Sequence, residues 1–224
     1  MKRLLLLLLI ALPAYATDPL IARLGDSATA LKKNDYAKAL RIDERLIRDM
    51  LDELGPGDVE SKWFSVAVTH RALALAGLHR DDDAIWYWHV ALNLYPAIEQ
   101  SDMSMFGAPA EFLKKHPLAE PDAPHVVPGV PRSDIHPPKT TKRIEPLYPR
   151  GMRAFHQTGI VILECVLDEH GDVRDVQLKK GLPGATLSYS AMEALRQWKF
   201  EPATIDGKPI TVIFNLTINF KMSP

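Results

Sequence analysis

The stretch at residues 210–220 reads ITVIFNLTINF, and its apolar side chains recur at every second position. This period of two is typical of a β-strand that buries one face in a core. The side chains predicted to face the core are Ile210, Val212, Phe214, Leu216, Ile218 and Phe220. The opposite face carries Thr211, Asn215, Thr217, Asn219 and Lys221, so the sequence predicts a half-buried strand that ends the chain.

A β-hairpin is predicted upstream of this strand. Residues 161–167 alternate in the same way and end at the turn sequence Asp168-Glu169-His170-Gly171. Apolar residues at 173, 176 and 178 then indicate a second, antiparallel strand.

A helix is predicted between the hairpin and the last strand. Apolar side chains recur at helical spacing from Leu187 to Trp198, Ser188 is placed to cap the helix, and Pro202 closes it. One helix packed on one face of a three-stranded antiparallel sheet is the economical arrangement of these elements. The predicted fold class is α+β.

Short motifs in this part of the chain occur in a recognisable order. They are Pro146-Leu147-Tyr148-Pro149, Gly159 at the start of the first strand, the turn at 168–171, Arg196-Gln197-Trp198-Lys199-Phe200-Glu201-Pro202-Ala203, and Gly207-Lys208-Pro209. In this combination, residues 142–222 resemble the TonB C-terminal domain family. We therefore assign a TonB-like domain to residues 142–224.

The resemblance implies that the domain binds peptides and is not an enzyme. Proteins of this family dock a peptide near the N-terminus of outer-membrane transporters and relay inner-membrane proton energy to them. The peptide adds as an extra strand to the edge formed by the last strand. The residues expected to contact it are Pro146, Tyr148, Thr211, Ile213, Asn215, Thr217 and Asn219.

The same resemblance indicates the partners. They are TonB-dependent outer-membrane transporters and, directly or through another anchored protein, the inner-membrane proton-channel motor proteins. The alternative function is a periplasmic interaction scaffold that transfers no energy. A sequence with 27 basic and 28 acidic side chains does not favour nucleic acid as a partner.

The N-terminal part has a different periodicity. Residues 17–116 show helical spacing almost throughout, which predicts an all-α region. The segment from Ala72 to Pro96 resembles a tetratricopeptide repeat, with small residues at Ala84 and Ala91 and an aromatic residue at Trp88. We interpret the aromatic residues around Trp88 as core, with a ligand groove as the alternative.

A proline-rich segment follows the helical region. Nine prolines occur between residues 117 and 149, and no helical period is present there. Such a composition favours extended polyproline II, so residues 117–141 are predicted to form a linker.

The first residues resemble a secretory signal peptide. Lys2 and Arg3 precede an apolar run from Leu4 to Leu12, and Ala14-Tyr15-Ala16 is suited to cleavage. The run is shorter than the roughly 20 residues that a membrane-spanning helix needs. The prediction is a signal peptide at residues 1–16 and a periplasmic protein. The alternative is an inner-membrane anchor that leaves the chain facing the periplasm.

Residues for enzymatic or metal chemistry do not form a recognisable motif. The histidines have no metal-binding spacing supported by cysteine or clustered carboxylates, and the single cysteine, Cys165, lies on the predicted core face of its strand. We expect no catalytic residues, no metal site and no cofactor.

Overall fold

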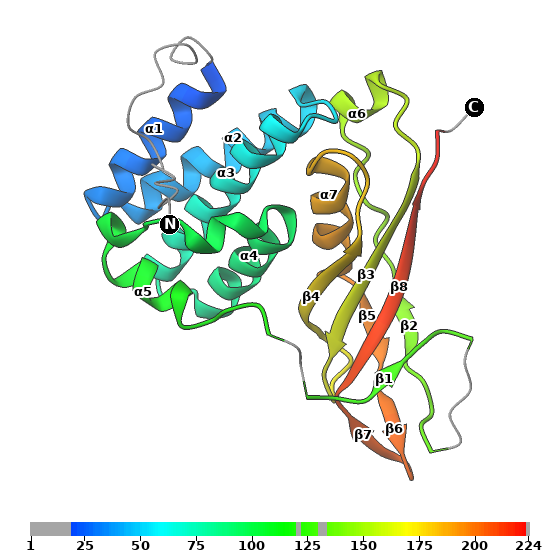
Figure 1. The fold of residues 1–224 in the computed structure, drawn as a ribbon. Helices are drawn as coiled ribbons and strands as arrows, with labels where there is room; N and C mark the ends of the chain where they lie inside the picture. Colours follow the sequence, from blue (N-terminus) through cyan, green and yellow to red (C-terminus); the bar gives the residue numbers. More distant parts are fainter. Residues whose placement is uncertain (1–18, 120–121, 130–133, 223–224) are drawn as a thin grey trace, which may run out of the picture. The chain divides into compact units, whose positions relative to one another are not determined.

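The computed structural model describes residues 19–119, 122–129 and 134–222. The chain divides into two compact units between Leu118 and Ala119 (Figure 1). Helices make up the first unit, and a sheet with helices makes up the second, which confirms the predicted α+β class. The predicted signal peptide at residues 1–16 lies outside the described residues.

The helices of the first unit are α1 (Pro19–Lys32), α2 (Tyr36–Glu53), α3 (Asp58–Gly77), α4 (Asp81–Leu94) and α5 (Ala108–Lys114), with 3-10 turns η1 (Pro96–Gln100) and η2 (Ser104–Phe106) before α5. Helices α1 to α4 each pack on the next, while α5 packs mainly on α3.

Two of the helix connections in this unit have the same geometry. Asn34 and His79 both adopt φ of 57°, in the left-handed region. The next amide N–H donates back across the helix end, from Asp35 to the Ala30 carbonyl oxygen at 2.9 Å and from Arg80 to the Leu75 oxygen at 3.0 Å. This pattern satisfies free carbonyls at a helix C-terminus and reverses the chain. The helices α1–α2 and α3–α4 are thus two hairpins built with the same turn.

The aromatic side chains of α4 lie in the core of the helical unit. Trp86 and Trp88 are 2% and 1% exposed, and the Arg71 guanidinium lies 3.7 Å from the Tyr87 ring centre. They therefore pack as core residues and do not line a groove. The tetratricopeptide-like character of the unit remains a prediction.

The second unit is built on a four-stranded sheet. Its elements are β1 (His125–Val126), β2 (Lys139–Lys142), α6 (Arg150–Ala154), β3 (Gly159–Leu167), β4 (Val173–Lys180), α7 (Thr186–Leu195), β5 (Lys199–Glu201), β6 (Ala203–Ile205), β7 (Lys208–Ile210) and β8 (Val212–Phe220). The sheet order is β1-β8-β3-β4, and β2–β5 and β6–β7 form two separate pairs.

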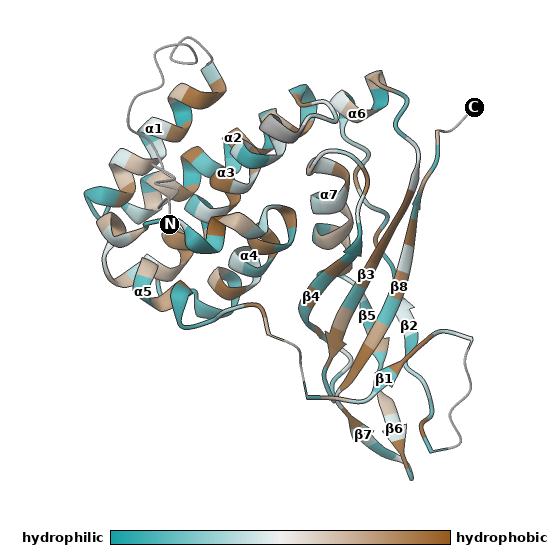
Figure 2. Cartoon of the chain, viewed as in Figure 1, coloured by the Kyte–Doolittle hydropathy of each residue, from teal (hydrophilic) through white to brown (hydrophobic). Residues whose placement is uncertain are grey.

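The central strands follow the predicted pattern. β3 pairs antiparallel with β4 and with β8, from Gly159 opposite Phe220 to Leu167 opposite Val212. β8 begins with three apolar residues, and hydrophilic and hydrophobic residues alternate from Asn215 onward (Figure 2). Helix α7 packs against β3 and β4. The core lies between this helix and the sheet.

Two local predictions are wrong. The strand predicted at 210–220 is interrupted at Thr211, because Asp206 and Gly207 form a turn with positive φ that pairs β7 with β6. The main strand therefore begins at Val212. Ser188 does not cap the helix, since α7 starts at Thr186 and places the Ser188 side chain inside its first turn.

The segment predicted as an extended linker belongs in part to the sheet unit. β1 pairs with β8, β2 pairs with β5, and His136 exchanges backbone hydrogen bonds with Thr204 at 2.9 and 3.0 Å. Ile135 is buried there. The structure thus differs from a free polyproline linker, because the prolines in this segment are separated by residues with free N–H groups and apolar side chains.

Trp198 anchors the segment that leads into the domain. Its indole N–H donates to the Ile144 carbonyl oxygen at 2.8 Å, and the ring is 3% exposed. The Arg143 guanidinium lies 5.1 Å from the ring centre on one side, and Phe200 lies 6.2 Å away between ring centres. The Ser190 hydroxyl donates to the Leu147 carbonyl oxygen. These contacts hold residues 143–149 against α7 and β5.

The β3–β4 turn is organised by the carboxylate of Asp168. It accepts hydrogen bonds from the backbone N–H groups of His170 and Asp172, both at 2.9 Å, and from Arg174 Nε at 2.6 Å. Burial raises the pKa of Asp168, but these donors outweigh that effect and hold the pKa below its ordinary value of 3.8.

Asp168→Asn is expected to destabilise the domain in a pH-dependent way. A carboxyl group with a lower pKa in the folded state stabilises that state above its unfolded pKa and loses this contribution as the pH falls through the folded pKa. The difference in unfolding free energy between parent and variant should thus be largest near neutral pH and shrink below pH 3.8. Denaturant unfolding of both proteins across this range tests it, and a constant difference contradicts the role given to the carboxylate.

Candidate functional site

The sheet has a charged edge at β4. This strand carries Arg174, Asp175, Lys179 and Lys180, and its pairing with β3 is irregular at both ends. Charges and bulges on an edge strand hinder the addition of another strand. The β4 edge is therefore poorly suited to bind an extended peptide.

The other edge of the main strands is formed by β8, which has neither charges nor irregular pairing from Val212 to Phe220. The Ile213 N–H points away from β3, since it donates to the Pro124 carbonyl oxygen at 2.9 Å. The Phe214 carbonyl points toward β3, where it accepts from Cys165 Sγ at 3.4 Å. Backbone groups of successive strand residues alternate in direction. The outer edge of β8 therefore presents the N–H and C=O groups of Asn215, Thr217 and Asn219.

Part of this outer edge is already paired. β1 runs parallel to β8, with His125 opposite Ile213 and Val126 opposite Phe214. From Asn215 onward no described strand pairs with the outer edge. A row of backbone donors and acceptors is thus available along the C-terminal half of β8.

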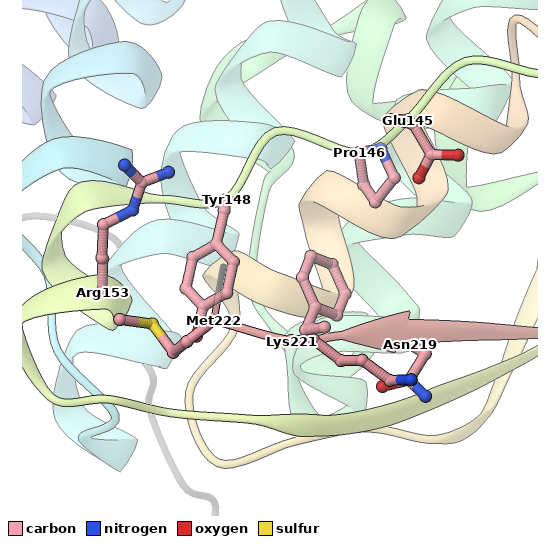
Figure 3. A pocket seen from close by; sticks show the side chains of 8 residues that line it. Glu145, Pro146, Tyr148, Arg153, Asn219, Lys221 and Met222 are labelled. Atoms are coloured by element: carbon pink, nitrogen blue, oxygen red, sulfur yellow. The ribbon is translucent and has the colours of Figure 1, made fainter. Parts of the chain in front are cut away.

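A pocket of about 310 Å³ lies at the C-terminal end of this free edge (Figure 3). It is lined by Glu145, Pro146, Tyr148, Arg153, Asn219, Phe220, Lys221 and Met222. The motif at 146–149 therefore lies beside the last residues of β8, although some seventy residues separate them in sequence.

Tyr148 forms a wall of the pocket and is held from several sides. Its hydroxyl donates to the Gln157 carbonyl oxygen, its ring meets Phe220 edge to face at 5.7 Å between centres, and the Arg153 guanidinium lies 5.5 Å from the ring centre. In Figure 3 the Tyr148 ring lies between the side chains of Arg153 and Pro146. A ring fixed in this way offers a rigid apolar surface to a bound side chain.

The charges around the pocket are predominantly positive. Arg153 and Lys221 supply two cations, while the carboxylate of Glu145 lies 3.0 Å from Arg143 Nε. The pocket therefore combines an aromatic wall with groups that favour an anionic or polar side chain.

The structure brings together most of the residues predicted to contact a peptide. Pro146, Tyr148 and Asn219 line the pocket, and Asn215 and Thr217 lie on the free edge. The other two predicted contacts, Thr211 and Ile213, lie elsewhere.

Ile213 and Thr211 do not lie on the free edge. Ile213 is 1% exposed and pairs with β1. Thr211 precedes β8, and its hydroxyl donates to Glu169 Oε1 at 2.8 Å at the β3–β4 turn. Thr211 therefore lies outside the free edge, because the β6–β7 hairpin ends the alternation before β8 begins.

Sequence reasoning missed five residues of the pocket: Glu145, Arg153, Phe220, Lys221 and Met222. Glu145 adjoins the recognised motif, and Lys221 continues the alternation past Phe220. Arg153 comes from α6, and no local sequence signal shows that it lies with Asn219 and Phe220 at the pocket.

Several ionisable groups outside this site are buried in the described parts of the chain. Among residues 19–119, 122–129 and 134–222, no cluster of three His, Cys, Asp or Glu side chains could hold a metal ion. Burial lowers the pKa of His70 to about 3 in the helical unit, and burial raises the pKa of Asp43 despite the nearby Ser27 hydroxyl and Arg71. Burial also raises the pKa of Cys165, which packs in the sheet.

Comparison with known proteins identifies relatives of the sheet unit. The family model described as Gram-negative bacterial TonB protein C-terminal matches residues 144–222. The TonB protein of Vibrio cholerae is 35% identical over 86 residues, which cover 38% of this chain and 35% of that protein. The TonB protein of Yersinia enterocolitica is 30% identical over 90 residues, covering 40% of this chain and 34% of that protein. The matched part thus spans about a third of these relatives.

A solved structure is also similar. The solution NMR structure of the Pseudomonas aeruginosa TonB CTD aligns with a TM-score of 0.36 and 24% identity, covering 44% of this chain and 95% of that one.

Proposed function

Since residues 144–222 form a domain of the TonB C-terminal family, we propose that this chain docks extended peptide segments of outer-membrane transporters on the free edge of β8. The docking serves energy-dependent uptake across the outer membrane. The observation that carries the proposal is the uncharged outer edge of β8 from Asn215, which ends in the pocket at Tyr148. Backbone pairing along the edge provides affinity, and the pocket selects a side chain of the peptide.

The setting of this function is the periplasm. Transporter segments that face the periplasm are accessible to a chain exported by its N-terminal signal, and an anchored form of the chain would face the same compartment. No described helix is long and apolar enough to cross a membrane. Energy coupling requires contact with inner-membrane motor proteins, either by this chain or by an anchored partner.

The N–H of Thr217 is the best single group with which to test strand addition. Thr217 is exposed, and its backbone faces outward from the middle of the free edge. Proline is tolerated on an edge strand where the lost N–H faces solvent. Thr217→Pro should therefore leave the domain folded and weaken peptide binding by about tenfold, corresponding to one lost backbone hydrogen bond with its unpaired acceptor.

The matched control is Thr217→Val, which keeps the N–H and changes only the exposed side chain. Both full-length variants would be titrated with peptides from the periplasmic N-termini of outer-membrane transporters while amide shifts are followed by NMR. Shifts concentrated at residues 215–221 support the proposal if they need about tenfold more peptide in Thr217→Pro and the same amount as the parent in Thr217→Val. Binding by folded Thr217→Pro that equals the parent's contradicts strand addition.

A further inference from the structure

The short strand β1 occupies the position that an added peptide would take on the first part of β8. The Pro124 carbonyl oxygen accepts the outward Ile213 N–H at 2.9 Å, and His125 and Val126 lie opposite Ile213 and Phe214. Figure 1 shows β1 lying beside β8 on the side away from β3. The chain thus adds a strand of its own to the outer edge.

Side chains on both faces of the sheet hold β1 in place. Val126 is 3% exposed, and the Ile213 side chain beside β1 is 1% exposed. On the face opposite α7, His125 Nδ1 lies 3.6 Å from Glu164 Oε2, a carboxylate that also meets Lys179 Nζ at 2.8 Å. The Gln177 side-chain amide donates to the Ala119 carbonyl oxygen at 3.2 Å. The segment is therefore fastened to β8, β3 and β4.

The sequence of the segment explains why β1 is so short. Pro128 has no N–H to donate, and Gly129 turns the chain with φ of 77°. The chain leaves β8 before Asn215. The part of the edge that remains begins at Asn215, with outward backbone groups at Asn215, Thr217 and Asn219, and leads past the end of β8 to Lys221 at the pocket.

We infer that β1 is a resident strand that confines partner peptides to Asn215–Lys221. The free edge fits an extended segment of about seven residues, which reaches the pocket at Tyr148. A longer partner strand must displace β1 to pair with Ile213. This inference rests on the proposed function for its partner, but the presence of β1 on the edge is testable without any peptide.

Amide hydrogen exchange on the full chain tests the resident strand directly. An amide held in a hydrogen bond exchanges more slowly than one that faces water, so the Ile213 amide should exchange at least about tenfold more slowly than that of Thr217 in the free protein. Exchange at Ile213 as fast as at Thr217 would overturn the inference.

Releasing β1 provides the second test. Val126→Asp places a carboxylate against the core and should detach β1, raising the exchange rate of Ile213 by about tenfold while the amides of β3 keep their protection. Val127→Asp is the matched control, because Val127 is 42% exposed and follows β1. The milder Val126→Gly should change Ile213 exchange in the same direction if the aspartate variant does not fold.

Peptide length then separates this inference from the proposed function. The probes are seven- and eleven-residue peptides from the periplasmic N-terminus of one outer-membrane transporter. The shorter should bind parent and Val126→Asp equally, whereas the longer should bind Val126→Asp about tenfold more tightly, because the parent must first free its edge. Equal affinity of the longer peptide for both proteins would overturn the inference. If neither peptide binds, the proposed function fails. The exchange experiment still shows whether β1 is paired with β8 in the free protein.

Discussion

Replacing Trp198 with alanine is expected to lower the unfolding free energy of the sheet unit by about 3–5 kcal/mol, the usual cost of deleting a large buried aromatic side chain. The residue is 3% exposed, and its N–H donates to the Ile144 carbonyl oxygen. The variant loses the packing against Phe200 and the attachment of the segment that carries Tyr148. Denaturant unfolding of the full chain, followed by a signal from the sheet unit, measures the effect.

Two further variants make this result specific. Trp198→Phe keeps an aromatic ring and removes the N–H, so it should cost less, about 1–3 kcal/mol for the unsatisfied carbonyl and the smaller ring. Phe155→Ala is the surface control, since Phe155 is 62% exposed in the same unit and its replacement should change stability by no more than about 0.5 kcal/mol. A Trp198→Ala protein as stable as Phe155→Ala would contradict the described packing.

Gly171→Ala is expected to have the second large effect. Gly171 adopts φ of 79° in the β3–β4 turn, and an added Cβ would lie 1.8 Å from the Phe200 carbonyl oxygen. The Phe200 N–H also donates to the Gly171 carbonyl oxygen at 3.0 Å, so the two backbones cannot separate without losing this bond. We expect a loss of about 3 kcal/mol or more, the sum of left-handed strain and a clash with backbone.

Gly207→Ala provides the matched control. Gly207 has a similar φ of 76°, but nothing lies within 4 Å of an added Cβ. Its replacement should cost only the conformational strain, about 1 kcal/mol. Thermal or denaturant unfolding of both variants isolates the steric part, and equal losses would show that Gly171 does not approach β5 so closely.

The sequence predicts elements whose pattern is local and long. The alternation in 161–167 and 212–220 and the helical spacing from Leu187 to Leu195 follow from burial of one face, and all three elements are present in the structure. Boundaries set by single interactions are less predictable. Ser188 has the right residue type for a cap, but the helix begins two residues earlier.

The sequence pattern does not predict which distant segments pair with one another. β1 has two residues, and its place beside Ile213 depends on contacts with β3, β4 and β8 that no periodicity reveals. Three residues that the sequence predicts as peptide contacts, Pro146, Tyr148 and Asn219, line the pocket, but the pocket itself was not predicted. Arg153 follows Tyr148 by only five residues, but the sequence does not show that both lie beside the end of β8.

The position of β1 also affects how the sheet unit can be studied as a fragment. A fragment that begins at residue 142 lacks β1 and all but the last residue of β2, although the compact unit begins at Ala119. It would expose the outer edge of β8 from Ile213 to Phe220, which β1 covers in part in the full chain. A long uncharged edge of this kind is a template for self-association through edge-to-edge pairing of identical copies. The choice of N-terminal boundary therefore decides whether an isolated domain presents to a peptide the same surface as the full chain, or one on which a second copy competes with the peptide.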